Sequence, residues 1–372
     1  MIYCSYNSSF FILDNNAIKV AGENYYKQFG IGALNSIYKS ITDGMVLPNI
    51  KSISNGYGQH VLYVMNDGTV KGIGRNNVSQ LGPLSGSTVS ELTDMPITNV
   101  KSAHTTMNST FFLMNDGTVK GCGYNEFGEL GLGNKNIKSN IVDIPISNVK
   151  SIHCGQAHVI FLLNDGTVKG CGRSSYGELA MSISYMPTIT DIPITNVKEV
   201  SCSGFSLFLL NDGTVKGCGT VGAALGGYVA AGTIKDMPIT GVKSIITTLS
   251  ESIFIMEDNT VKGCGSNTKG TLGLGNKTSQ TNIVTIPITD VKYAFSGERN
   301  LFYLLNDGTV KGVGYNLFGQ LGIGNEIDQT SIITIGVTGI KQEYSPSIPQ
   351  YNIRTGNFTI VDQDLTIDVN LL

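Results

Sequence analysis

Apolar and polar positions repeat along almost the whole chain. The recurring phrase is close to FLLNDGTVKGCGYN, in which an apolar run, a polar Asp-Gly turn and a second short run follow one another. Apolar runs on both sides of Asp-Gly predict a β-hairpin, because Gly accepts the positive φ that such a turn needs. We assign the acidic turn residue to Asp14, Asp67, Asp116, Asp165, Asp212, Asp258 and Asp307. These positions lie 46 to 53 residues apart, so we predict seven copies of one unit.

Each unit continues with a Gly-rich bend and a proline. The bend reads GYNEFGELGLGN at 123–134 and GYNLFGQLGIGN at 314–325, and no helical period follows it. Tight backbone packing is therefore favoured over a phosphate-binding loop. The proline recurs at Pro48, Pro96, Pro145, Pro193, Pro238 and Pro287, with Gly336 in the seventh unit. Proline cannot donate to a sheet ladder, so we place it on an outer edge or in the connection after it.

Four short strands per unit predict an all-β fold, a seven-bladed β-propeller of four-stranded blades. The chain ends complement each other: 337–345 begins a unit that has no hairpin, and 8–22 supplies a hairpin with scarcely any strand before it. We therefore expect the C-terminal strand to pair with the N-terminal hairpin and to close the ring, which makes 1–345 the propeller. Residues 346–372 fall outside the repeat, and their alternating apolar and polar pattern predicts a docking or assembly segment.

Composition excludes several functional classes. Of 372 residues 46 are Gly, none is Trp, and only 14% are charged, with a formal net charge of −3. This weak acidity argues against a nucleic-acid partner, which usually requires concentrated Lys and Arg. The chain has no apolar run of the roughly 18 residues that span a membrane and no signal-peptide pattern, so we expect no membrane insertion.

Lysines occupy two positions of every unit. One set is Lys19, Lys71, Lys120, Lys169, Lys216, Lys262 and Lys311. The other set is Lys51, Lys101, Lys150, Lys198, Lys243, Lys292 and Lys341. Because both are spread evenly around the predicted ring, we interpret them as solvated strand positions and not as a binding footprint.

The pattern of an apolar run, DGTV, a small residue before Gly, and then FGxLGxGN resembles the regulator of chromosome condensation repeat, which builds seven-bladed propellers. The resemblance covers residues 1–345. Where that family commonly has Trp before Gly, this chain has Ala21, Ile73, Cys122, Cys171, Cys218, Cys264 and Val313, which implies a differently packed blade. The founding member is an exchange factor for the GTPase Ran and binds chromatin. Its exchange activity uses an inserted hairpin for which the intervals here leave no room, so we do not expect that activity.

No catalytic or metal motif is present. GxSxG, HExxH and Walker-type sequences are all missing, so we predict no enzyme, no catalytic residue and no cofactor. An enzyme that pairs carboxylates from different blades is the alternative. His153, Cys154 and His158 cluster without a zinc-type spacing, and His60 shares the register of His158, so we interpret these histidines as packed side chains and predict no metal. The four repeat-locked cysteines are interpreted as small, reduced, buried side chains.

Function is expected where the repeat varies. The residue after the hairpin's Cys-Gly pair changes from unit to unit, and Arg and Tyr are favoured there, as they are at binding hot spots. His104 and His153 share a register near a loop and are expected to line a propeller face. The candidate binding residues are Arg75, Tyr124, Arg173, Tyr315, Tyr57, His104, His153, Glu298 and Arg299. Ordinary loop variation is the alternative.

These features predict a non-enzymatic binding propeller. Near-identical repeats rich in Asn, Ile, Lys and Ser are typical of bacterial or phage sequences. The leading hypothesis is a structural or receptor-binding component of a phage tail or phage-like contractile particle, made in the bacterial cytoplasm and released by lysis. Its partners would be particle subunits, another protein or a bacterial surface glycan. The alternative is an intracellular protein-interaction or regulatory propeller.

Overall fold

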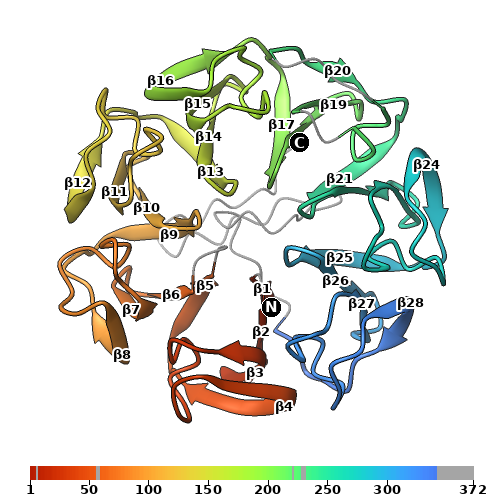
Figure 1. Ribbon diagram of the computed structural model, residues 1–372, viewed down its shortest axis with the longest axis horizontal. Coiled ribbons are helices and arrows are strands. Elements are labelled where there is room, and N and C mark those ends of the chain that lie inside the picture. The colour runs from red at the N-terminus through yellow and green to blue at the C-terminus, as the bar shows by residue number, and fades with distance from the viewer. Residues whose placement is uncertain (6, 56–58, 220–221, 228–231, 342–372) are drawn as a thin grey trace, which may run out of the picture.

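The computed structural model describes residues 1–5, 7–55, 59–219, 222–227 and 232–341 as seven four-stranded antiparallel sheets. The sheets stand around a central axis like the blades of a propeller (Figure 1). None of the described residues lies in a helix. The predicted all-β, seven-bladed fold is confirmed. The segment 346–372, predicted to dock or assemble, lies outside the described residues.

The strands follow one another from blade to blade. Blades 1 to 4 contain β1 (Ile2–Cys4), β2 (Ser8–Ile12), β3 (Ala17–Asn24), β4 (Ser36–Val46), β5 (Ile50–Ser54), β6 (His60–Met65), β7 (Val70–Arg75), β8 (Thr88–Asp94), β9 (Val100–Thr105), β10 (Ser109–Met114), β11 (Val119–Gly123), β12 (Lys138–Ile144), β13 (Val149–Cys154), β14 (His158–Leu163), β15 (Val168–Arg173) and β16 (Tyr185–Ile192). Blades 5 to 7 contain β17 (Val197–Cys202), β18 (Ser206–Leu210), β19 (Val215–Cys218), β20 (Lys235–Asp236), β21 (Val242–Thr247), β22 (Glu251–Met256), β23 (Val261–Gly265), β24 (Gln280–Ile286), β25 (Val291–Ser296), β26 (Asn300–Leu305), β27 (Val310–Gly314) and β28 (Gln329–Thr334).

The first strand of each blade lies next to the axis and the fourth lies at the rim (Figure 1). Because successive strands are antiparallel, the loops after the first and third strands share one end of the ring, which we name the loop face. The turns after the second strands and the connections to the next blade share the other end, the hairpin face. The recurring proline lies in that connection, for example Pro96 between β8 and β9, as predicted.

The hairpin turns show why their sequence recurs. The Asp116 carboxylate accepts hydrogen bonds from the backbone N–H and the hydroxyl of Thr118, and Gly117 has a φ of 80°. Blade 1 corrects the predicted register. There the turn carboxylate is replaced by Asn15, whose Oδ1 accepts the N–H of Ala17, so the assignment of Asp14 to this turn is wrong by one residue.

Blade 1 is closed by both chain ends. Ile340 pairs with Leu13, and the N–H of Lys341 donates to the Ile12 carbonyl at 2.9 Å, so the predicted pairing of the C-terminal segment with the N-terminal hairpin is confirmed. The rest of the innermost strand is β1, whose three residues agree with the prediction of scarcely any strand before the N-terminal hairpin. The amino nitrogen of Met1 donates to the Lys341 carbonyl at 2.6 Å and thereby joins the two pieces.

The position where related repeats carry Trp lies between blades. The Cys171 thiol contacts the Glu129 carbonyl oxygen of the preceding blade at 3.0 Å, and Cys218 contacts the Glu178 carbonyl at 3.2 Å. Both side chains are fully buried, and all seven cysteines are unbridged. Burial raises the pKa of the Cys218 thiol to about 12, so this cysteine is a packed, unreactive group, as predicted.

In blades 2, 3, 6 and 7 the Gly-rich bend presses against the outer strand of the next blade in the ring. A Cβ added to Gly128 would lie 2.2 Å from the Pro187 Cα, and Gly128 has a φ of 81°. Asn125 fixes the bend from inside, because its Oδ1 accepts the N–H of Leu130 and its amide donates to the Asn134 carbonyl. Repeated glycines therefore serve blade packing, as the sequence predicts.

We expect Gly128→Ala to destabilise the protein more than Gly308→Ala. Both glycines have a positive φ, but an added Cβ at Gly308 meets nothing within 4 Å. Denaturant unfolding of the two variants measures their losses in free energy of unfolding. Both losses include the cost of a positive φ at Ala, and we expect the steric clash at position 128 to add about 1–3 kcal/mol to that loss. Equal losses would show that the bend yields without cost.

Candidate functional site

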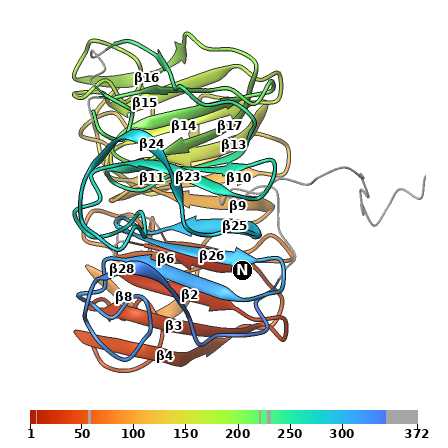
Figure 2. The same ribbon diagram turned by 90° about the vertical axis from the view of Figure 1, so that its right-hand side faces the viewer.

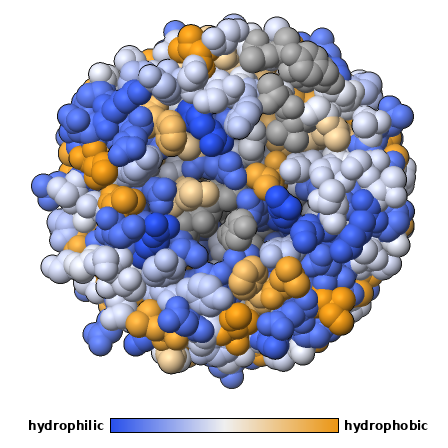
Figure 3. Space-filling view, viewed as in Figure 1, coloured by the Kyte–Doolittle hydropathy of each residue, from blue (hydrophilic) through white to orange (hydrophobic). Residues whose placement is uncertain are grey.

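Large apolar side chains are exposed mainly on the loop face. Nine are exposed among the described residues, and eight of them lie in or beside the loops of that face: Leu34, Met107, Ile137, Tyr176, Ile183, Tyr185, Leu317 and Ile327. Only Val46, at the end of β4, lies on the hairpin face. The space-filling view of the loop face shows separate apolar groups around its rim (Figure 3). The exposed apolar side chains therefore lie mainly on the face that carries the longer loops, as separate groups.

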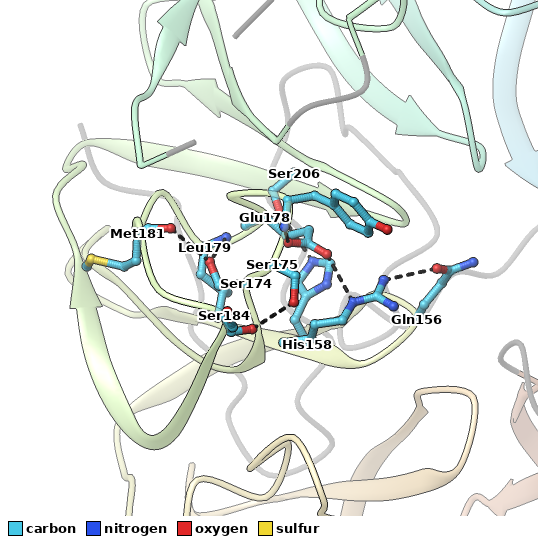
Figure 4. Close-up of polar contacts among 11 residues, drawn as sticks. Gln156, His158, Ser174, Ser175, Glu178, Leu179, Met181, Ser184 and Ser206 are labelled. Carbon is cyan, nitrogen blue, oxygen red and sulfur yellow. Dashed lines mark hydrogen bonds and ion pairs between the residues drawn. The ribbon is translucent and has the colours of Figure 1, made fainter. Parts of the chain in front are cut away.

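Blade 4 carries a hydrogen-bonded polar cluster on this face. Arg173, at the end of β15, donates from Nε to Glu178 Oε1 and from Nη2 to Gln156 Oε1, both at 3.1 Å. The Glu178 side chain is completely buried, whereas that of Arg173 is 21% exposed. Figure 4 shows Gln156 and Glu178 on opposite sides of the guanidinium group that donates to both of them. The guanidinium is thus held in one orientation at the surface.

An exposed tyrosine lies beside this arginine. The Tyr176 ring centroid is 5.7 Å from the Arg173 guanidinium carbon, and Tyr176 is 54% exposed. Its backbone N–H donates to Glu178 Oε2 at 2.8 Å, so the same carboxylate orients both residues. A fixed Arg next to an exposed Tyr has the composition of a protein-binding hot spot.

The histidines of blades 2 and 4 join neighbouring blades. His158 Nε2 lies 3.3 Å from the Ser206 hydroxyl, which donates to the Glu178 carbonyl, and both side chains are buried (Figure 4). His60 makes the equivalent contact with Thr110. Burial, and then the nearby arginine, lowers the pKa of each imidazole to about 3. The predicted packed role of His60 and His158 is confirmed.

Three other predicted residues also lie at the ends of third strands on the loop face. The Arg75 guanidinium carbon is 5.9 Å from the Tyr26 ring centroid. The Tyr124 hydroxyl donates to Glu126 at 2.6 Å, which raises the tyrosine pKa to about 12. They belong to separate blades, so the ring does not gather them into one pocket.

The third of these residues, Tyr315, belongs to an aromatic cluster. Its ring contacts that of Phe318 with centroids 6.2 Å apart, and Lys269 Nζ lies 4.8 Å above it. Phe318 also contacts Tyr25 of blade 1, so the cluster joins two blades.

Glu298 and Arg299 lie in the loop between β25 and β26. Burial raises the pKa of Glu298 to about 7, an effect that the Arg299 charge opposes. His104 and His153 do not line an open face, and that expectation is wrong. They lie buried on the inner strands β9 and β13, where their Nε2 atoms bond Ser102 and Ser151. Tyr57 lies outside the described residues.

Sequence reasoning missed the carboxylates inside the Gly-rich bends. In blades 2, 3, 4 and 7 the residue before the Leu of the bend turns its side-chain oxygen to the backbone N–H two residues earlier. This bond joins Glu129 to Phe127 and Glu178 to Tyr176, and Gln80 to Val78 and Gln320 to Phe318 in other blades. Glu129 is only 2% exposed, and burial raises its pKa to about 7. The signal was available, because a carboxylate alternates with Gln at one position of the repeat.

The described residues offer little for other chemistry. Among them no three His, Cys, Asp or Glu side chains gather as metal ligands. In that part of the chain no helix has the length and apolar character needed to cross a bilayer. Fold and site together define a seven-bladed β-propeller whose distinctive side chains lie on one face.

Comparison with family models shows which known repeat the propeller is similar to. Two models described as the regulator of chromosome condensation (RCC1) repeat match residues 116–162 and 149–178. Residues 116–178 are therefore similar to the RCC1 repeat, the family that the sequence pattern indicates.

Solved structures agree on the fold. Human WBSCR16 has a TM-score of 0.76 and 20% identity, covering 86% of this chain and 94% of that protein. Yeast RCC1 (Prp20), in a complex with Kap60, has a TM-score of 0.76 and 18% identity over 90% of this chain and 85% of that one. Prp20p from Saccharomyces cerevisiae has the same TM-score and 19% identity, with 88% of each chain covered.

Proposed function

We propose that this protein is a non-enzymatic propeller that binds a protein partner on its loop face. The observation that carries the proposal is the concentration of exposed apolar side chains on that face. Blade 4 has the richest part of it, where Tyr176 and Tyr185 flank the fixed Arg173. Interface centres are enriched in Tyr and Arg, and these residues lie on loops held by a rigid scaffold.

Similar propellers support a protein as the partner class. One structure shows yeast Prp20 with Kap60 bound to it. The other is of Prp20p, whose binding to Gsp1p and histones is described with it. This favours the protein-interaction interpretation over the particle component that we derived from sequence style. No relative or structural feature favours a phage tail, a virion or a surface glycan, so those roles form no part of the proposal.

A capture experiment with matched variants tests the proposal. The immobilised full chain is compared with the double variant Tyr176→Ser/Tyr185→Ser in extracts of its source cells, and retained proteins are identified by cross-linking mass spectrometry. We expect a defined protein to be retained by the full chain and reduced at least about tenfold by the double variant.

Val46→Ser is the control, because Val46 is 73% exposed on the opposite face. It should leave retention unchanged. Loss of the partner with the Val46 variant, or equal retention by the double variant, would place the interface elsewhere. Retention of cell-wall polysaccharide in place of a protein would contradict the partner class.

A further inference from the structure

The second set of repeated lysines lies on the innermost strands, next to the ring axis. Each is the second residue of an innermost strand, or, in blade 1, follows Ile340 at the equivalent place. We name Lys51, Lys101, Lys150, Lys198, Lys243, Lys292 and Lys341 the inner lysines. Figure 1 shows the innermost strands grouped around the axis. One lysine of each blade thus lies at the hairpin-face end of an innermost strand, where Lys150 is exposed and Lys243 is buried.

The strand geometry sets these lysines apart. In β5, β13, β17, β21 and β25 the pairing register shifts across the lysine, so two residues oppose one on the neighbouring strand. Such bulges redirect a side chain and are over-represented near functional sites. Burial, and the charge of Lys101 in the next blade, lower the pKa of Lys51, which shows that ammonium groups of adjacent blades influence one another.

The other lysine set provides the contrast. These outer lysines lie on third strands, where Lys120 and Lys169 form ion pairs with Asp143 and Asp191 on the rim strands. Lys19, Lys71 and Lys216 do the same in their own blades. By comparison, Lys243 and Lys341 donate to the neutral side-chain oxygens of Asn259 and Asn16. Among the described residues, Lys51, Lys150 and Lys198 form no ion pair.

The carboxyl group of Glu199 lies near two of the inner lysines, Lys198 and Lys150. Glu199 on β17 accepts hydrogen bonds from the Ser244 hydroxyl and the Ile245 N–H. Burial raises its pKa to about 8, even though Lys198 and Lys150 oppose that rise. Glu199 is therefore largely protonated at neutral pH and offsets little of the positive charge.

The surrounding charges restrict what can bind. The hairpin turns lie outside the innermost strands on the same face, and their carboxylates at Asp67, Asp116, Asp165, Asp212, Asp258 and Asp307 are exposed, with lowered pKa values caused by bonds from the following threonines. Positive charge at the axis is therefore encircled by negative charge. An extended polyanion such as duplex DNA would cross the acidic circle, whereas a compact anion would meet only the lysines.

We propose that the inner lysines form a binding site for a compact polyphosphate anion on the hairpin face. This site lies at the opposite end of the ring from the proposed protein-binding face and does not depend on it. Lysine ammonium groups suit phosphate oxygens because they act as mobile point charges with three donors.

Titration calorimetry with the full chain and inositol hexakisphosphate tests the site. We expect saturable binding, with one ligand per chain, that weakens as the salt concentration rises. The triple variant Lys101→Gln/Lys150→Gln/Lys198→Gln should weaken it at least about tenfold. The control Lys120→Gln/Lys169→Gln/Lys216→Gln removes the same charge from the outer set and should change the affinity by less than about threefold.

Two results would overturn the proposal: no binding to the full chain, or equal weakening by the inner and outer triple variants. A duplex DNA oligonucleotide that binds as tightly as the inositol phosphate would also contradict a compact ligand. If the inner triple variant fails to fold by circular dichroism, the single variant Lys150→Gln replaces it, because Lys150 is exposed. Its affinity should fall measurably below that of Lys169→Gln.

Discussion

A chain that ends at residue 336 is expected to lose about 4–9 kcal/mol of folding free energy and to unfold or aggregate near physiological temperature. Val337 and Ile340 are almost completely buried, and each contributes about 1.5–3 kcal/mol. The truncation also removes backbone hydrogen bonds from Asp14 to Gly339 and from Lys341 to Ile12, worth about 0.5–1.5 kcal/mol each. The sum approaches the whole stability of an ordinary domain.

The matched control is a chain that ends at residue 345. It keeps Val337, Ile340 and Lys341 together with their contacts to the described residues, so we expect its melting temperature to stay close to that of the full chain. Thermal unfolding followed by circular dichroism measures both. If the two truncated chains melt together, the closure contacts do not stabilise the ring.

Replacing Glu129 with Gln is expected to stabilise the protein at pH 8 by about 2 kcal/mol and to have little effect near pH 4.5. The pKa of Glu129 is raised from 4.5 to about 7, so the folded state binds a proton more tightly than the unfolded chain. The free energy of unfolding therefore falls as the pH rises from about 4.5 to about 7. Above that range the buried carboxylate costs on the order of 3 kcal/mol, at about 1.36 kcal/mol per pH unit.

Other blades show that Gln suits the position. The Gln80 and Gln320 side-chain oxygens accept the same backbone N–H bond that Glu129 accepts. Their amide nitrogens have no partner among the described residues, which reduces the expected gain by about 1 kcal/mol. Urea unfolding at pH 4.5, 6 and 8 measures the effect.

Glu178→Gln is the control of opposite sign. Glu178 occupies the equivalent place in blade 4, but it is paired with Arg173. Removing its charge leaves the guanidinium without its buried partner, and we expect a loss of about 2 kcal/mol at pH 8. A pH-independent effect of Glu129→Gln would show that the Glu129 carboxyl is not the titrating group.

The sequence predicted several individual residues of the candidate site but not the contacts between them. Arg173, Tyr124 and Tyr315 were identified because they vary at a fixed place in the repeat, and all three lie on the loop face. Their partners were not identified, because Gln156 and Glu178 lie in different loops and meet Arg173 only when blade 4 folds. His104 and His153 were misplaced, since alternation along a strand does not say which side of an inner strand is covered by the next blade.

The sequence by itself determined the number of blades, the position of each hairpin and the closure of the ring. These features depend on bonds between near neighbours in the chain, such as that from Thr118 to Asp116, and on one pairing between the ends. Only the tertiary structure decided that five lysines of one set pair with rim aspartates while the other set lies on the innermost strands. The reason is geometric: both sets recur at nearly the same interval, and only the distance of a strand from the axis separates them.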